Sequence, residues 1–148
     1  MFMADSPAKA ILDTSVYLPY LRKDFEILQL GFLLRPTLLY MSSVVFAEIY
    51  AGAKDRATFL SLRKLYRTFE RLNRLVTPDK QVWFEAGEVL QEFGTRYGFE
   101  EKGIARLSHD VLIALTARKI GAVVYTYNRR DFERIQAIRN FQLRAQEV

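Results

Sequence analysis

The chain contains no cysteine, a single histidine and no long uninterrupted apolar run. Without cysteine it can form no disulfide, thiolate nucleophile or cysteine-ligated zinc site, which fits a reducing compartment. His109 alone cannot supply the ligands of a typical zinc site, and no spacing supports a Ser-His-Asp triad. Charged residues or proline interrupt every apolar segment well before the roughly 20 residues that a membrane span needs. We therefore expect a protein that makes no membrane contact.

The first seven residues lack both the basic start and the apolar stretch of a signal peptide, so the sequence predicts a cytoplasmic protein. Repeats, low-complexity tracts and linkers rich in proline, glycine or serine are also missing from the sequence. The 148 residues, half of them hydrophobic, are enough to bury a core. We therefore expect residues 1–148 to form a single domain.

The formal net charge of +5 favours a polyanionic partner, although charge alone is weak evidence. Nine of the 22 lysines and arginines gather in two places. Arg129 and Arg130 form a short pair, and a longer segment holds the larger group of Lys54, Arg56, Arg63, Lys64, Arg67, Arg71 and Arg74. The larger group also fits the solvated face of a helix, and that alternative stays open.

Apolar runs of strand-like character alternate with segments of helical periodicity. The predicted strands are residues 9–13, 37–41, 74–77, 122–126 and 141–143. The predicted helices are residues 14–21, 25–34, 57–73, 80–97 and 108–120, with further helices beginning near Ser42 and Asp131. Such alternation predicts an α/β fold, a three-layer αβα sandwich around a mainly parallel sheet of about four or five strands.

Three carboxylates, Asp13, Glu48 and Asp110, each adjoin an apolar run in this otherwise basic chain. An acid near a core costs several kcal/mol unless its charge is compensated. Ligands of such sheets bind at the carboxyl ends of the strands, where Asp13 and the segment after Thr126 are expected. The sequence thus predicts that the three acids converge on one divalent cation.

Each acid has a simpler interpretation when it is taken alone. Glu48 has no cation three or four positions away and can extend from the rim of its helix to water. Asp110 follows the expected cap Ser108, so it can lie in the first turn of its helix and interact with the helix dipole. Asp13 can serve as a turn or cap residue. Their joint occurrence favours a shared site.

Three acids with an amide or hydroxyl fit Mg²⁺ or Mn²⁺, which prefer oxygen ligands and retain several waters. His109 adjoins Asp110 but points about 100° away from it on a helix, so we expect a surface residue. Neither the Gly-x-x-x-x-Gly-Lys nor the Gly-x-Gly-x-x-Gly loop is present, which argues against nucleotide binding by those routes.

Four segments in order, residues 11–15, 42–52, 110–117 and 124–132, resemble the motifs of the PIN-domain ribonucleases. The resemblance spans almost the whole chain and is greatest to the VapC-type toxins of toxin–antitoxin pairs. It implies metal-dependent hydrolysis of RNA, with Mg²⁺ or Mn²⁺ held by Asp13, Glu48 and Asp110, directly or through water.

The resemblance also implies roles for residues around these acids. Thr14 or Thr126 would hydrogen-bond a ligand carboxylate or a water, and Arg129 and Arg130 would clamp flanking phosphates. Some family members carry a fourth Asp after the last motif strand, where this chain has Asn128. Asn128 or Asp131 is therefore a further candidate metal ligand, and capping of the next helix is the alternative role for Asp131.

Family members form homodimers and are silenced by an antitoxin, so both partners are expected, with the amphipathic stretch 59–93 as the surface. Two other enzyme classes fit less well. A haloacid-dehalogenase-like phosphatase needs an Asp where Ser15 stands, and a receiver domain needs an acidic pair and a Lys that are not evident. A degenerate PIN module that binds RNA or a partner without cleavage remains the non-catalytic alternative, which Asn128 leaves open.

Overall fold

Strands and helices alternate along the chain in the computed structural model, which describes residues 6–21 and 35–146. The strands are β1 (Lys9–Leu12), β2 (Leu38–Ser42), β3 (Leu75–Val76), β4 (Ala122–Thr126) and β5 (Leu143–Ala145). The helices are α1 (Thr14–Leu21), α3 (Ser43–Ala51), α4 (Arg56–Arg71), α5 (Lys80–Tyr97), α6 (Glu101–Ile120) and α7 (Arg129–Ile138). The helix expected over residues 25–34 lies outside the described residues.

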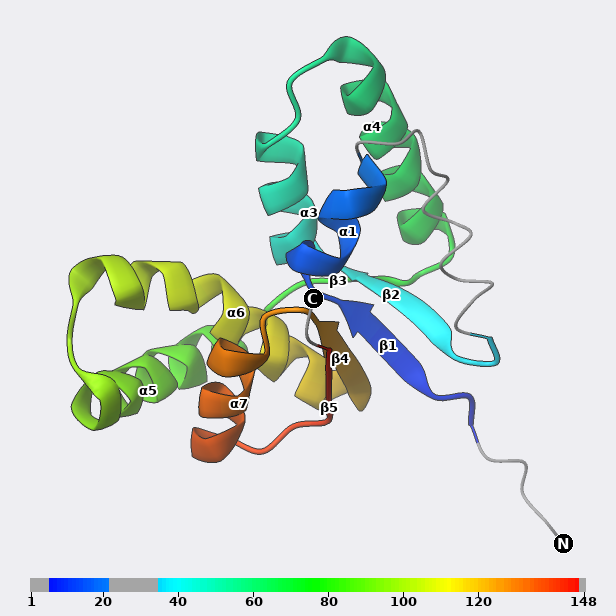
Figure 1. Ribbon diagram of the computed structural model, residues 1–148. Helices are drawn as coiled ribbons and strands as arrows, with labels where there is room; N and C mark the ends of the chain where they lie inside the picture. Colours follow the sequence, from blue (N-terminus) through cyan, green and yellow to red (C-terminus); the bar gives the residue numbers. More distant parts are fainter. Residues whose placement is uncertain (1–5, 22–34, 147–148) are drawn as a thin grey trace, which may run out of the picture.

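The described strands form one five-stranded sheet in the order β3-β2-β1-β4-β5, and every pairing is parallel. Two groups of helices flank it, one made of α1, α3 and α4 and the other of α5, α6 and α7 (Figure 1). This arrangement confirms the expected αβα sandwich, with a sheet that is wholly parallel over the described residues.

The centre of the sheet is the point at which the chain reverses its direction of travel across the strands. β1 pairs with β2 on one side and with β4 on the other, and Leu12 lies opposite Tyr125. The backbone N–H of Asp13 donates to the carbonyl of Tyr125 at 2.9 Å. Ligands of open α/β sheets bind in the crevice beyond such a switch point. Asp13 and Thr126, which ends β4, therefore lie side by side where a ligand is expected.

Ser42 starts the helix that carries Glu48. Its hydroxyl accepts hydrogen bonds from the N–H groups of Val44 at 3.2 Å and Val45 at 3.5 Å, which satisfies donors that the first turn leaves unpaired. The helix therefore begins where the sequence predicted, with Ser42 as its cap. Helix α3 then carries Glu48 into its second turn, on the same edge of the sheet as Asp13.

Helix α6 begins earlier than the sequence indicated. It starts at Glu101 rather than at Ser108, and the Ser108 hydroxyl donates to the carbonyl of Ala105 at 2.7 Å instead of capping. The helix ends where expected, at Gly121, whose φ of 70° suits glycine. Asp110 therefore lies in the middle of a helix, and its interpretation as a first-turn residue stabilised by the helix dipole is wrong.

Smaller corrections concern the ends of other elements. β2 and β5 lie one and two residues later than expected, and β3 is shorter. Helix α4 is capped by Asp55, whose Oδ1 accepts from the N–H of Thr58, and it ends before the predicted boundary at residue 73. Helix α7 begins at Arg129 with Asn128 at the N-cap position, so Asp131 lies within the first turn.

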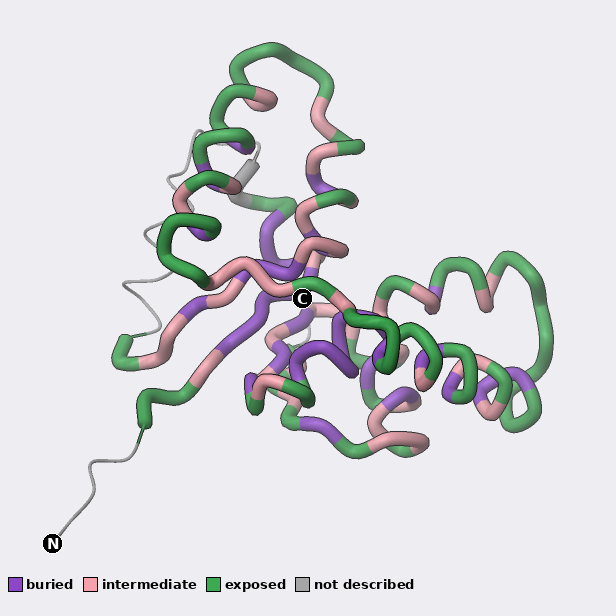
Figure 2. Tube along the Cα trace, turned by 180° about the vertical axis from the view of Figure 1, so that it is seen from behind, coloured by how far each residue is buried: buried purple, intermediate pink, exposed green. Residues whose placement is uncertain are grey.

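The core lies along the sheet and the adjoining length of α6. The run 111–117 of α6 is buried on every side, and β1 is buried from Ala10 to Leu12 (Figure 2). Asp110 directly precedes this buried run, so the helix carries its carboxyl group to the edge of the core. No helix in the described ranges 6–21 and 35–146 combines the length and apolarity that a membrane span requires.

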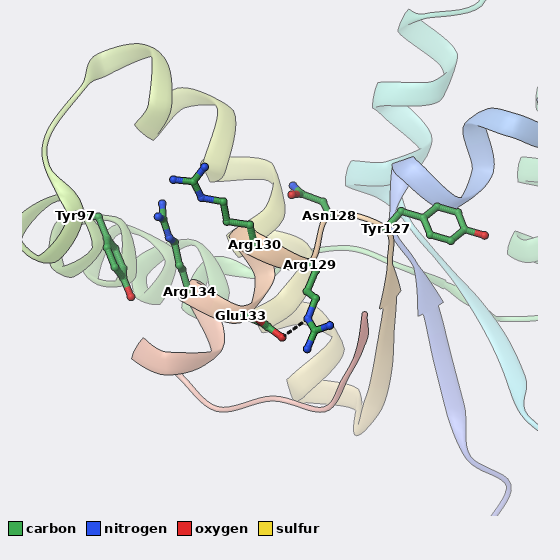
Figure 3. Close-up of a pocket in the computed structure, with 7 residues that line it drawn as sticks. All are labelled: Tyr97, Tyr127, Asn128, Arg129, Arg130, Glu133 and Arg134. Carbon is green, nitrogen blue, oxygen red and sulfur yellow. Dashed lines mark hydrogen bonds and ion pairs between the residues drawn. The ribbon is translucent and has the colours of Figure 1, made fainter. Parts of the chain in front are cut away.

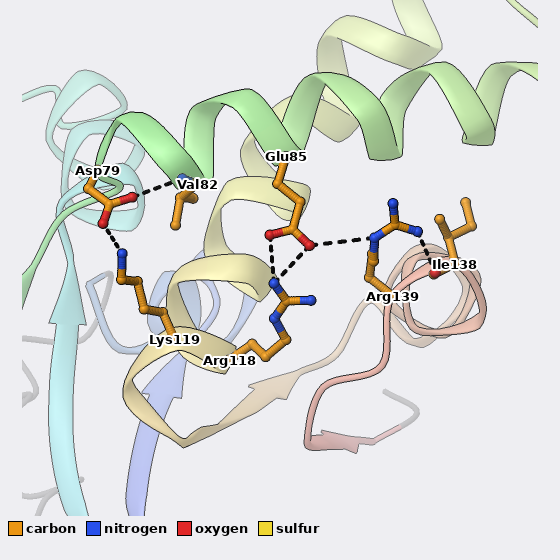
Figure 4. Close-up of polar contacts among 7 residues, drawn as sticks. All are labelled: Asp79, Val82, Glu85, Arg118, Lys119, Ile138 and Arg139. Atoms are coloured by element: carbon orange, nitrogen blue, oxygen red, sulfur yellow. Dashed lines mark hydrogen bonds and ion pairs between the residues drawn. The ribbon is translucent and has the colours of Figure 1, made fainter.

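Ion pairs fasten α5 to the two helices beside it. Both carboxylate oxygens of Glu85 accept from Arg118 of α6, at 2.6 and 2.7 Å, and Arg139, just after α7, approaches the same carboxylate at 3.4 Å (Figure 4). Near the start of α5, Asp79 pairs with Lys119. These contacts hold α5, α6 and the end of α7 together.

Candidate active site

Asp13, the residue directly after β1, is buried with 4% of its surface exposed. Its Oδ1 accepts a hydrogen bond from the N–H of Thr14 at 2.7 Å. Its Oδ2 accepts from the hydroxyls of Ser15 at 2.7 Å and Thr126 at 2.8 Å. Three donors replace much of the hydration that a buried carboxylate loses, and they fix its orientation. Thr126 is thus placed against Asp13 by a direct bond.

The two hydroxyls that serve Asp13 also hold the chain beyond β4. Ser15 accepts from the backbone N–H of Tyr127 at 3.1 Å, and Thr126 accepts from that of Asn128 at 2.9 Å. Sequence reasoning did not identify Ser15 as a site residue. The available signal was a hydroxyl two positions after a strand-end acid, but only the fold shows that it reaches both Asp13 and β4.

Glu48 is joined to the site from two directions. The Thr14 hydroxyl donates to its Oε1 at 3.0 Å, and Nδ1 of His109 lies 3.5 Å from its Oε2. His109 is half exposed, as expected of a surface residue, yet it also contacts Glu48. Helices α3 and α6 pack together, so a side chain that turns away from Asp110 on α6 turns towards α3. Sequence periodicity alone does not reveal this contact.

The pKa of Asp110 shows how strongly the acids of the site affect one another. Burial, followed by the negative charges of Asp13, Asp131 and Glu48, raises the pKa of its carboxyl group to about 8. Arg106 opposes this rise but is the smallest influence. Four carboxyl groups thus share one local field. The excess of negative charge is the condition that a bound cation would relieve.

Asn128 lies between two of these acids. Its Nδ2 is 3.1 Å from Oδ2 of Asp131 and 3.4 Å from Oδ2 of Asp110, and it donates to both. Asp131 is also 3.8 Å from the guanidinium of Arg106. The structure therefore brings both candidate additional residues, Asn128 and Asp131, to the acidic cluster. The side chain of Asn128 makes no capping bond to α7.

The cluster is not a closed metal cage. In the described part of the chain, no three Asp, Glu, His or Cys side chains lie close enough to form a ready-made metal-binding group. The donors nevertheless fit Mg²⁺ or Mn²⁺ in chemistry, because they are carboxylate and amide oxygens in a field where the negative charges outweigh the positive charge of Arg106. Such cations retain several waters and take only a few carboxylates directly. Asp13, Glu48 and Asp110 would hold one, with Asn128 or Asp131 in addition.

Arg129 and Arg130 open α7 beside the acids, and their side chains separate. Nε of Arg129 donates to Oε1 of Glu133 at 2.7 Å, one turn along the helix. Arg130 points to the other side, towards Arg134 (Figure 3). Both lie on the rim of a pocket that also includes Asn128. Of the predicted pair, Arg129 is thus bonded to Glu133, whereas Arg130 is directed into the pocket.

The family follows from a sequence comparison. Residues 10–138 match the PIN domain family, and the match includes every acid of the cluster. The chain belongs to the PIN domain family, which confirms the resemblance of the four motifs. No curated protein sequence matches the chain.

Solved structures agree with this fold. DNA-bound VapBC from Salmonella typhimurium is 25% identical, with a TM-score of 0.65 over 93% of this chain and 98% of that one. VapBC2 from Rickettsia felis, bound to a DNA fragment from the promoter, is 22% identical with a TM-score of 0.66, over 94% and 99% of the two chains. VapBC-1 from nontypeable Haemophilus influenzae is 22% identical with a TM-score of 0.62, over 93% and 97%.

Proposed function

We propose that residues 1–148 form a single metal-dependent ribonuclease domain that acts as the toxin of a VapBC-type toxin–antitoxin pair. The observation that supports this most is the environment of Asp110, whose pKa is raised to about 8 by burial and by the charges of Asp13, Asp131 and Glu48. Perturbed acids of this kind gather at functional sites. Here they lie at the switch point of a PIN-family sheet.

In this proposal, the acids bind the metal and the neighbouring hydroxyl groups orient the acids. Asp13, Glu48 and Asp110 hold Mg²⁺ or Mn²⁺, directly or through water. A metal bound there would lower the pKa of a bound water and neutralise charge on the scissile phosphate. Thr126 and Ser15 orient Asp13 through their hydroxyl bonds, and Thr14 does the same for Glu48.

The proposed partners are an RNA substrate, a cognate antitoxin and a second copy of the chain, all in the cytoplasm. The similarity to VapBC complexes supports an antitoxin. Stretch 59–93, the expected contact surface, carries large apolar side chains that are more than half exposed, namely Leu60, Trp83 and Phe84. Leu60 lies on α4, whereas Trp83 and Phe84 are neighbours on α5. Adjoining exposed apolar groups are typical of surfaces that bind another protein, so α5 is the better supported part of the stretch.

The test is cleavage of labelled RNA by the purified chain with Mg²⁺, with Mn²⁺ and with EDTA. We expect cleavage with either metal, none with EDTA, and none with Asp13→Asn. Glu88→Gln is the matched control, because Glu88 is an exposed acid of α5 outside the cluster. Cleavage that persists in EDTA, or that survives Asp13→Asn, would contradict the proposal.

One observation favours the non-catalytic alternative. The amide of Asn128 already bridges Asp110 and Asp131, and the described acids form no ready-made cage, as a PIN module that binds without cleaving would allow. In that case the purified chain would bind RNA or a protein partner but would not cleave RNA with either metal. The same assay therefore separates the two functions.

A further inference from the structure

A basic pocket lies next to the acidic cluster. It has a volume of about 960 Å³ and is lined by Tyr97, Tyr127, Asn128, Arg129, Arg130, Glu133 and Arg134. Asn128 belongs to both places, since it lines the pocket and donates to Asp110. A chain-like ligand held at the acids would therefore continue into this pocket.

Two arginines of the pocket carry unneutralised charge. Arg130 and Arg134 are one helical turn apart on α7, and both extend to the same side of it (Figure 3). The pocket's one carboxylate, Glu133, is engaged by Arg129 at 2.7 Å. Within the described residues, neither Arg130 nor Arg134 pairs with a carboxylate. Like charges at this spacing destabilise a helix slightly, and an anion between them removes that cost.

The ring of Tyr97, at the end of α5, holds one of the two guanidinium groups. The Cζ of Arg134 lies over the ring, 4.8 Å from its centroid. The ring itself packs on the buried Phe93 at a centroid distance of 4.7 Å. A guanidinium laid on an aromatic face keeps the donors at its edge available for a phosphate. Tyr97 is thus a positioning residue for Arg134.

We propose that Arg130 and Arg134, with Tyr97 behind Arg134, bind the backbone phosphates of a single-stranded RNA next to the phosphate held at the acids. This phosphate clamp, defined as Arg130, Arg134 and Tyr97, rests on the proposed function and names the residues that bind the substrate backbone beside the acids. The sequence led us to expect phosphate contacts from Arg129 and Arg130. Because Arg129 is paired with Glu133, the clamp uses Arg134 in its place.

Single-stranded RNA is favoured over a duplex for a physical reason. The guanidinium of Arg134, held over the ring of Tyr97, presents a planar surface. Only an unpaired base can leave its neighbours to stack on a guanidinium or aromatic plane, whereas a duplex keeps its bases stacked inside. Phosphates alone would not distinguish the two forms, but phosphates together with this surface do.

The test measures binding without cleavage. All variants carry Asp13→Asn, and the probe is a short fluorescein-labelled single-stranded RNA in Mg²⁺ buffer, titrated at several salt concentrations. We expect R130A/R134A to bind at least about tenfold more weakly. The slope of log K against log salt should become shallower by roughly 0.7 for each lost phosphate contact. R63A/R67A is the matched control, because these exposed arginines have the same spacing on α4.

Two results, one from the control variant and one from a duplex probe, would contradict the clamp. Equal losses in R130A/R134A and R63A/R67A would reduce the effect to net charge and overturn the clamp. Equal affinity for the duplex of the same sequence would overturn the assignment to single strands. Cleavage by the chain with Asp13 intact is measured separately. Absence of cleavage contradicts the proposed nuclease, whereas an unchanged affinity in R130A/R134A contradicts only the clamp.

Tyr97 gives a second, independent test. Tyr97→Phe keeps the ring and should bind RNA like the parent, whereas Tyr97→Leu should weaken binding. If Tyr97 acts through Arg134, Tyr97→Leu should add little to Arg134→Ala, because the two share one interaction. Additive losses, or an equal loss in the Phe and Leu variants, would overturn the positioning role.

Discussion

Thr14 and Glu48 lie 34 positions apart and are joined by a hydrogen bond of 3.0 Å between the Thr14 hydroxyl and Oε1 of Glu48. The backbone N–H of the same threonine donates to Asp13 at 2.7 Å. One residue thus orients two carboxylates that come from different elements, one after β1 and one on α3. The spacing between these acids depends on it.

Thr14→Val should therefore reduce cleavage while leaving the fold intact. It removes the hydroxyl bond but keeps the shape and the backbone N–H. Because Glu48 is partly exposed and can hydrate, we expect a loss of about 1 kcal/mol or less in the free energy of unfolding. The Mg²⁺ concentration for half-maximal cleavage should rise, and Thr14→Ser should restore it. A metal requirement that matches the parent in Thr14→Val would show that the bond has no such role.

Asp110 should make stability depend on pH in the absence of metal. The folded protein keeps its proton up to a pH of about 8, whereas the unfolded chain releases it near the ordinary value of 3.8. Between these values the folded state binds more protons, so the free energy of unfolding falls as the pH rises. The fall is at most about 1.4 kcal/mol per pH unit. Urea denaturation in EDTA across this range measures it.

Asp110→Asn is the control for that slope, since it removes the titrating group. The variant should lose most of the decline between pH 4 and pH 8. A cation competes with the proton on Asp110, so the affinity of the parent for Mg²⁺ should increase as the pH approaches about 8. Stability that rises with pH over this window, or an identical slope in Asp110→Asn, would contradict the assignment.

Glu48→Gln should abolish cleavage without lowering stability. Clustered carboxylates repel one another without metal, and Glu48 is among the charges that raise the pKa of Asp110. Neutralising it removes a metal ligand and relieves this repulsion, so the melting temperature should stay the same or increase. Glu88→Gln is the comparison. A large drop in melting temperature for Glu48→Gln, or full activity at saturating Mg²⁺, would argue against the site.

Thr126→Val should destabilise the protein, because the Thr126 hydroxyl is buried and donates to Asp13. Loss of a donor to a buried charge costs about 1–3 kcal/mol. Thr116→Val provides a matched contrast, because Thr116 is also buried but its hydroxyl has no hydrogen-bond partner among the described residues. That change should be neutral or stabilising. Equal effects of the two substitutions in thermal denaturation would mean that the bond to Asp13 contributes little.

The sequence predicted the sheet well, because apolar runs that end in acids identify buried parallel strands. The first strand was placed with Asp13 at its end, and the strand 122–126 was placed without error. Convergence of the acids on one edge followed from the general behaviour of parallel sheets. These inferences needed only local patterns and one topological rule.

The start of α6 was less accessible to sequence reasoning. Ser108 resembled a cap, and Gly103 disfavours a helix by about 1 kcal/mol relative to alanine. The helix nevertheless continues back to Glu101, and Ile104 and Leu107 pack on the core. Tertiary packing outweighs the local preference. For a similar reason, the contact between His109 and Glu48 could not be foreseen, since it depends on how α6 meets α3.

The ion pairs of Glu85 with Arg118 and Arg139 have a consequence for how the acids can move. They brace the helices that deliver Asp110 and Asp131, while Asp13 and Glu48 are fastened to each other through Thr14. Helices α3 and α6, which carry Glu48 and Asp110, already pack together where His109 contacts Glu48. A cation shared by Glu48 and Asp110 would add a second link between these two helices, so its binding should slow hydrogen exchange in α3 and α6 together.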